Sequence, residues 1–90
     1  MQQVWIFNGQ GAAFPSAVFT TREAAEEWIA RHNLQGTLTQ YPVNISSYDF
    51  AIENGWFTPK HEYQHSPAFI QRFSSASQEH YHFDNDDADA

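Results

Sequence analysis

The sequence contains no cysteine and few basic residues, and these two shortages exclude several classes of protein. Without cysteine, the chain has neither disulfide bonds nor thiolate metal sites. Four Lys and Arg side chains stand against eleven Asp and Glu, which gives a net charge of −7. Direct binding to a nucleic-acid backbone requires a patch of Lys and Arg. We therefore expect neither a disulfide scaffold nor a protein that binds nucleic acid.

Long apolar runs are also missing. No stretch of the sequence approaches the roughly 18 apolar residues that span a bilayer. Residues 1–3 carry no basic side chain and lead directly into a short apolar run, unlike a secretory signal peptide. These features predict a cytoplasmic protein that does not insert into membranes.

Aromatic residues, in contrast, are abundant. Eight Phe, four Tyr and three Trp outnumber all Val, Ile and Leu residues together. Rings must therefore supply most of the core volume of the one small domain that this length allows. The rings that we expect in the core are Trp5, Phe7, Phe19, Trp28 and Phe50.

The acidic residues are distributed unevenly along the chain. Residues 84–90 hold four Asp and no basic residue, whereas residues 1–83 hold seven acidic and four basic residues. Like charges at the density of the last segment repel one another and favour a solvated chain. We therefore predict one compact domain over residues 1–83 and a flexible acidic tail over residues 84–90.

The first half of the chain shows the patterns of a hairpin, a helix and a further strand. Residues 4–7 and 14–19 are apolar runs around a Gly-containing turn, which is typical of a β-hairpin. Residues 20–23 fit a capping box that starts at Thr20, and apolar side chains then recur at helical spacing. Residues 37–41 predict the next strand. A crossover through the helix would make its two flanking strands parallel.

The second half predicts shorter elements. Ser46 begins a second short helix, and a Ser-Pro pair at residues 66–67 is typical of another helix start. The polar stretch 58–67 between two prolines indicates a surface loop. Residues 79–83 alternate polar and aromatic side chains, which predicts a C-terminal edge strand. Together the patterns predict an α+β domain with a small mixed sheet.

The most specific match to a catalytic motif is a His-Glu-x-x-His pattern that runs from His61 to His65. In a zinc peptidase, the two His bind the metal one helical turn apart, and the Glu, here Glu62, activates a water. That geometry requires an uninterrupted helix, and Pro67 disfavours helical dihedral angles at the residue before it. A solvated loop and a small metal-dependent hydrolase are therefore the two interpretations of this segment.

A second pair, His80 and His82, lies in the predicted edge strand. On a strand, these two side chains face the same side, where both imidazoles could meet a divalent cation. In the hydrolase interpretation, either His80 or His82 is the third metal ligand. The competing interpretation is the exposed face of an edge strand. Because histidine titrates near neutrality and carboxylates lie close in sequence, a pH-sensitive patch is a further interpretation.

The remaining motifs point to structure rather than catalysis. The Asn-Gly-Gln-Gly segment at residues 8–11 lacks the third glycine and the following helix of a phosphate-binding loop, so it predicts a hairpin turn. Asp49 and Glu53 form an i,i+4 carboxylate pair, which suits acid–base chemistry or a solvated helix face. No Ser lies in a nucleophile elbow. We expect a protein that is not an enzyme and that requires no cofactor.

The surplus of rings also predicts a binding surface. Rings that remain exposed resemble those enriched at protein interfaces, and the net acidity favours a basic protein partner. The alternative is that the rings fill a core that is short of aliphatic side chains. The candidate partner-binding residues are Trp56, Phe57, Tyr63 and Tyr81, together with the carboxylates of Asp49 and Glu53.

Several segments carry a family resemblance, beginning with Val-Trp-Ile-Phe-Asn-Gly at residues 4–9 and the Phe-Thr-Thr-Arg-Glu helix start at residues 19–23. Further segments are residues 36–43, 48–51, 73–76 and 78–83, so the resemblance covers residues 4–83. They resemble a family of small uncharacterised bacterial proteins, a domain of unknown function, which lends no catalytic residue. In size and acidity the chain is similar to the immunity proteins that bacteria encode beside secreted toxins. This likeness implies an inhibitor that neutralises a basic toxin domain by protein–protein contact.

Overall fold

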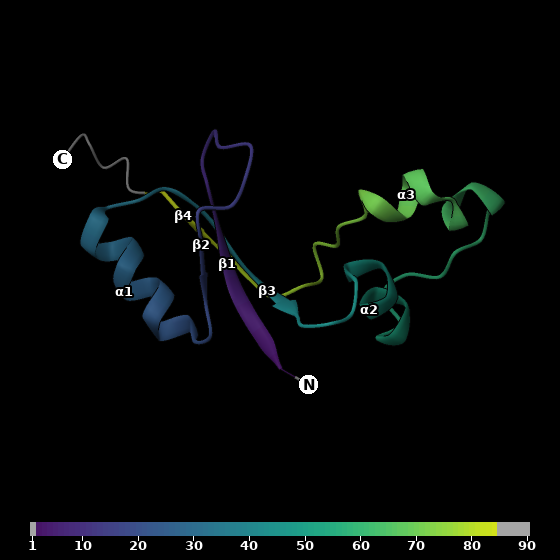
Figure 1. Ribbon diagram of the computed structural model, residues 1–90, viewed down its shortest axis with the longest axis horizontal. Helices are drawn as coiled ribbons and strands as arrows, with labels where there is room; N and C mark the ends of the chain where they lie inside the picture. Colours follow the sequence, from purple (N-terminus) through teal and green to yellow (C-terminus); the bar gives the residue numbers. More distant parts are fainter. Residues whose placement is uncertain (1, 85–90) are drawn as a thin grey trace.

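Within residues 2–84, four strands and three α-helices confirm the predicted α+β class (Figure 1). The computed structural model describes residues 2–84, so residues 85–90 of the predicted acidic tail lie outside the described residues. The elements are β1 (Gln3–Gly9), β2 (Ala17–Phe19), α1 (Arg22–His32), β3 (Gly36–Pro42), α2 (Ser47–Glu53), the 3₁₀-helix η1 (Glu62–His65), α3 (Pro67–Gln71) and β4 (His80–Phe83).

The strands form one sheet in the order β2-β1-β3-β4, and each neighbouring pair is antiparallel. The N-terminal hairpin is confirmed, although its second strand is limited to residues 17–19. The two strands that flank α1 point in the same direction, as a crossover predicts, but β1 lies between them. The reason is that the hairpin already places β2 on one edge of β1, so that α1 carries the chain across to the other edge.

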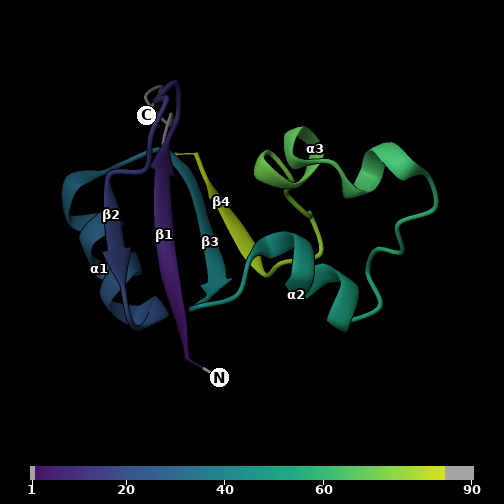
Figure 2. The same cartoon turned by 45° about the vertical axis from the view of Figure 1, so that its right-hand side comes forward.

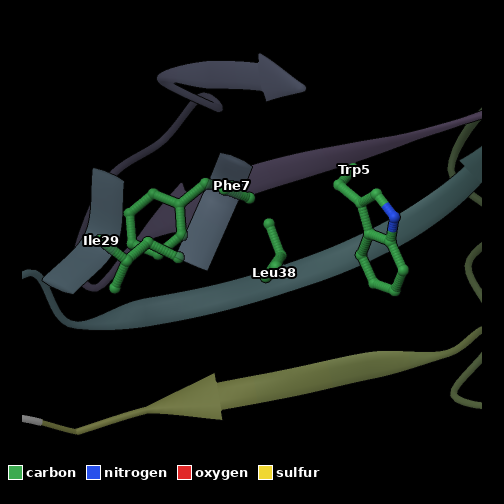
Figure 3. Close-up of a cluster of buried hydrophobic side chains, with 5 residues drawn as sticks. Trp5, Phe7, Ile29 and Leu38 are labelled. Atoms are coloured by element: carbon green, nitrogen blue, oxygen red, sulfur yellow. The ribbon is translucent and has the colours of Figure 1, made fainter. Parts of the chain in front are cut away.

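One face of the sheet packs against α1. Trp5 and Phe7 of β1 and Leu38 of β3 point toward the helix, where they meet Ala25 and Ile29 (Figure 3). Phe7, Ile29 and Leu38 are 2%, 1% and 0% exposed, and full burial of such a side chain contributes about 1.5–3 kcal/mol. Six further side chains surround this core as partly buried neighbours: Ala17, Phe19, Trp28, Leu34, Tyr81 and Phe83.

The start of α1 differs from the prediction by one residue. The N-cap is Thr21, whose hydroxyl accepts a hydrogen bond of 3.2 Å from the backbone N of Ala24. Glu23 therefore occupies the second helical position and not the third, so the predicted capping box from Thr20 does not form. At the other end, Asn33 adopts the left-handed conformation with φ 55° and closes the helix.

A glycine is required where β3 begins. Gly36 pairs with Gly9 of β1, and its φ is +156°. A Cβ atom at this position would lie 2.4 Å from the backbone oxygen of Asn8. The close approach of β1 and β3 at this end of the sheet therefore depends on the missing side chain.

Residues 43–77, between β3 and β4, form a second part of the molecule that we call the helical lobe (Figure 2). It lies beyond β4, beside the sheet lobe of residues 2–42 and 78–84, and gives the protein an elongated shape of 50 × 28 × 19 Å. Its α-helices begin at the predicted caps, since Ser46 and Ser66 each accept a hydrogen bond from a backbone N–H three residues later. No helix within residues 2–84 is both long and apolar enough to cross a membrane.

Aromatic rings hold the helical lobe together. Tyr48 is buried and lies within 6.2 Å, centre to centre, of the rings of Phe57, Phe69 and Phe73. The Tyr48 hydroxyl donates a 2.7 Å hydrogen bond to the backbone oxygen of Gln64 in η1, an element that the predicted loop 58–67 did not include. Phe50, expected in the main core, instead packs against Trp56 in this lobe, because residues 43–77 do not fold over the sheet.

Candidate functional site: the open face of the sheet

The sheet has a second face, directed away from α1, which we call the open face. Strand side chains alternate between the two faces, and the pairing places Val18, Ile6, Thr39 and His80 in one row across the four strands. In Figure 2 the strands lie side by side with α1 behind them and the helical lobe beyond β4. The open face comprises Val4, Ile6, Asn8, Val18, Thr37, Thr39, Tyr41, His80 and His82.

The open face carries no formally charged side chain, because none of the four strands contains Asp, Glu, Lys or Arg. Val18 is 61% exposed, and Val4 and Ile6 are half-buried on the same face. Exposed carboxylates lie elsewhere in the sheet lobe, for example Glu23 and Glu27 on α1. This face therefore offers apolar and uncharged polar side chains for contact. Its titratable groups are the two imidazoles of β4 and the phenol of Tyr41.

Two open hollows border this face. The first, of about 250 Å³, lies where the connector from the helical lobe passes β3 and β4, and its walls include Thr39, Tyr41, Ser75 and His80. The second, of about 390 Å³, lies at the opposite end of β4, where His82 and Asp84 approach the turn after β1. Both hollows therefore contain a histidine of β4.

The two histidines of β4 lie on the same face of an edge strand, as predicted. Their ring centres are 5.1 Å apart, and the ring planes are nearly perpendicular. His80 Nδ1 lies 2.7 Å from the backbone oxygen of Gln78, and His82 Nδ1 lies 3.3 Å from Thr37 Oγ1. Each ring is therefore oriented by a protein oxygen at Nδ1.

Gln78 positions the start of β4, a role that no sequence pattern predicted. Its side chain is 3% exposed, and its Nε2 donates a 3.0 Å hydrogen bond to the backbone oxygen of Gln40. The backbone N of Gln40 in turn donates to the oxygen of Glu79 at 3.0 Å. A buried amide must be paired in this way, but a Gln within a polar stretch cannot be distinguished from an exposed one by pattern alone.

The predicted partner-binding rings do not form one surface. Trp56 and Tyr63, which are 40% and 61% exposed, belong to the helical lobe. Phe57 belongs to the same lobe but is half-buried among its rings. Tyr81 lies in the sheet lobe, on the face that packs against α1.

Tyr81 links β4 to the start of α1. The guanidinium carbon of Arg22 lies 3.7 Å from the centre of the Tyr81 ring, and Arg22 Nη1 donates a 2.9 Å hydrogen bond to the phenol oxygen. The phenol donates in turn to the carboxylate of Glu79, and this hydrogen bond is the main reason why the pKa of Tyr81 is raised. A hydrogen bond to Glu26 raises the pKa of Arg22.

The two predicted carboxylates lie on α2. Asp49 supports the N-cap of that helix, since its carboxylate accepts a 2.9 Å hydrogen bond from the Ser46 hydroxyl. Glu53 is exposed at the last position of the helix. The structure thus gives Asp49 a capping role and places Glu53 in solvent.

The His-Glu-x-x-His segment does not form an α-helix. His61 precedes the 3₁₀-helix η1 in an extended conformation, and His65 is its last residue. A 3₁₀-helix has three residues per turn, so positions four apart point in different directions. Within residues 2–84, no three His, Asp or Glu side chains lie close enough together to hold a metal ion.

One family model matches the chain. It is described as a domain of unknown function, DUF7710, and it matches residues 4–89. The match runs through both lobes and includes residues 84–89, which the sequence resemblance left outside. No curated protein and no solved structure matches the chain.

Proposed function

We propose a function for this chain, which belongs to the family described as a domain of unknown function, DUF7710. Because that description names no activity, the proposal is argued from the residues of the open face. The proposed function is protein binding: the chain acts as an immunity-type inhibitor whose open face covers a basic toxin domain. This proposal extends the likeness to immunity proteins from size and acidity to a particular surface.

The observation that carries the proposal is an uncharged, partly apolar sheet face in a strongly acidic protein. The row of Val18, Ile6 and Thr39 crosses three neighbouring strands without a charged side chain. Depletion of charge at the centre and polar residues at the rim are the usual anatomy of a protein interface. Binding there would remove exposed apolar surface, most of all at Val18, from water.

The charge of the chain supports a basic partner. The net charge is −7, and exposed carboxylates such as Glu23, Glu27 and Glu53 lie on the helices rather than on the open face. Charges outside an interface steer a partner of opposite sign and raise the association rate at low salt. The partner that fits is a basic protein domain with an exposed apolar segment at its centre.

The metal-dependent hydrolase gains no support from the geometry. His61 and His65 lie in the helical lobe, whereas His80 and His82 lie on β4 of the sheet lobe. A zinc hydrolase requires three protein ligands around one open position. The four histidines do not gather into one such centre, so we do not propose this reaction.

The proposal is tested by placing a negative charge on the open face. In the Val18→Glu variant, a carboxylate replaces the most exposed apolar side chain of the row, at its β2 end. The matched control is Ala24→Glu, which adds the same charge at an exposed position on α1. The binding partner in the test is the protein encoded by the gene next to the one for this chain, where an immunity protein's toxin is encoded. For each variant we would measure its affinity for that protein in solution and its ability to protect growing cells against it.

We expect the wild-type chain and Ala24→Glu to bind this protein and to protect the cells, with affinities within about twofold of each other. Val18→Glu should bind at least about tenfold more weakly, because its carboxylate would be buried without a partner. Equal binding by the two variants would show that the open face is not the interface. Failure of the wild-type chain to bind or to protect would contradict the immunity function.

A further inference from the structure

We propose that His80 and His82 together form a binding site for a divalent transition-metal ion of the Zn²⁺ class. The ion would be held by the Nε2 atoms of both imidazoles and completed by water. This site is separate from a hydrolytic centre and does not rest on the proposed protein-binding function. It rests on the geometry of one strand pair and on the hydrogen bonds that orient the two rings.

The spacing of the rings fits one ion. Zinc lies about 2.0–2.1 Å from a ligating imidazole nitrogen, so each ring centre would be roughly 3.2 Å from the ion. At a tetrahedral angle, two such rings have their centres about 5 Å apart. The observed separation of the His80 and His82 ring centres is 5.1 Å. The two rings are therefore already at the distance that chelation of one ion requires.

The tautomer of His80 is set by its backbone contact. Its Nδ1 lies 2.7 Å from the carbonyl oxygen of Gln78, and a carbonyl can only accept a hydrogen bond. Nδ1 therefore carries the proton, and in the neutral ring Nε2 carries the lone pair that binds a metal. A hydrogen bond from one ring nitrogen to a protein oxygen is the usual support of a metal-ligating histidine.

His82 is oriented from the neighbouring strand by a hydroxyl, which can donate or accept and therefore permits the tautomer with a free lone pair on Nε2. Its Nδ1 lies 3.3 Å from Thr37 Oγ1, and Thr37 is its pairing partner on β3. Thr37 also lines both hollows that border the open face. The two imidazoles are thus oriented by separate partners, one from the backbone before β4 and one from β3.

The surroundings favour a cation with several water ligands. The strands contain no Lys or Arg that would repel an ion, and the guanidinium of Arg22 lies over Tyr81, whose side chain points to the opposite face. The hollow of about 250 Å³ beside His80 leaves room for metal-bound water. Because no cluster of three ligands exists within residues 2–84, water must fill at least two positions. We therefore expect the site to bind the ion with moderate affinity.

The test is a calorimetric titration of the full chain with Zn²⁺ alone. The variants are His80→Gln and His82→Gln, each of which removes one imidazole. The amide of the new side chain can still donate a hydrogen bond to the oxygen atom that Nδ1 contacts in the wild-type chain. His61→Gln with His65→Gln is the matched control, since it removes two exposed imidazoles of the helical lobe. A second control, Asp86→Asn with Asp87→Asn, removes carboxylates from the acidic C-terminal segment.

We expect one ion per chain, at least about tenfold weaker binding in each of the two β4 variants, and a change below about twofold in both controls. Nitrogen NMR of the histidine rings should show that Zn²⁺ perturbs Nε2 of His80 and His82 while the proton on His80 Nδ1 is retained. Absence of binding by the wild-type chain would overturn the proposal. So would equal affinity in a β4 variant, or a loss of affinity in a control as large as in the β4 variants.

Discussion

The two lobes of this protein build their interiors by different means. In the sheet lobe, Phe7, Ile29 and Leu38 are almost completely buried between α1 and a continuous ladder of paired strands. In the helical lobe, only Tyr48 and Ala51 are buried among the hydrophobic residues, and most of the ring cluster remains partly exposed. The first lobe thus has a layered core, whereas the second has a cluster of rings at the junction of short helices.

This difference indicates where the stability of the molecule resides. The two α-helices of the helical lobe contain five and seven residues, and isolated helices of this length are unstable in water. Ring contacts and the caps at Ser46 and Ser66 must hold them in place. We therefore expect the sheet lobe to set the global free energy of unfolding and the helical lobe to open locally at lower cost.

Removing a ring from the layered core should have the largest effect. Phe7→Ala leaves a cavity between β1 and α1, and such a substitution costs about 3–5 kcal/mol. Because small domains are stable by only about 5–15 kcal/mol, this substitution should remove a large part of the global free energy of unfolding. Denaturant unfolding followed by tryptophan fluorescence and by circular dichroism measures this loss.

The matched control for that experiment is Val18→Ala on the open face. Val18 is 61% exposed, so its loss should change the free energy of unfolding by less than about 0.5 kcal/mol. If Phe7→Ala were no more destabilising than Val18→Ala, the layered core would not be the main source of stability.

Removing a ring from the helical lobe should have a smaller and local effect. The Phe73 ring lies within 5.5 Å, centre to centre, of the rings of Tyr48 and Phe57, and it is half-buried. Phe73→Ala should therefore cost about 2 kcal/mol within this lobe. Amide hydrogen exchange should accelerate in α2 and α3 but not in β1 and β3. An equal acceleration in both lobes would show that the two unfold as one unit.

The sequence predicted most elements because their signals are local. The apolar runs of the hairpin, the caps at Ser46 and Ser66 and the alternation in β4 each involve neighbouring residues. The position of β1 between β2 and β3 was not predicted, because it depends on which edge of β1 is free after the hairpin forms. The same holds for Phe50, since nothing in the pattern separates residues 43–77 from the main core.

The open face was missed for a related reason. Val4, Trp5, Ile6 and Phe7 form an unbroken apolar run, so alternation could not show which two side chains face α1. The pairing with β3 resolves this, because it places Phe7 beside Leu38 and Ile6 beside Thr39. The sequence pattern also could not show which rings are exposed. Trp56 and Tyr81 both stand in mixed polar and aromatic segments, but Tyr81 is covered by Arg22, which lies 59 residues away along the chain.

A change at Glu79 should have the smallest effect, because it alters one hydrogen bond at the surface of the sheet lobe. The pKa of Tyr81 is raised chiefly by its hydrogen bond to Glu79, whereas the charge of Arg22 lowers it. Glu79→Ala removes the raising contact and leaves Arg22, so the pKa of Tyr81 should fall. Tyrosinate absorbance, assigned by subtraction of the Tyr81→Phe variant, measures the shift, and Glu23→Ala is the control on α1.

The direction of the stability effect follows from the same contact. A pKa that is higher in the folded than in the unfolded chain means that folding favours the neutral phenol. The resulting contribution to the free energy of unfolding is complete at pH values below the ordinary pKa of tyrosine. It disappears as the pH rises through the raised pKa of Tyr81. Glu79→Ala should therefore make stability less dependent on pH in the alkaline range, while Glu23→Ala leaves the dependence unchanged. A Tyr81 pKa that stayed constant or rose in Glu79→Ala would show that Glu79 does not hold the phenol in the folded protein.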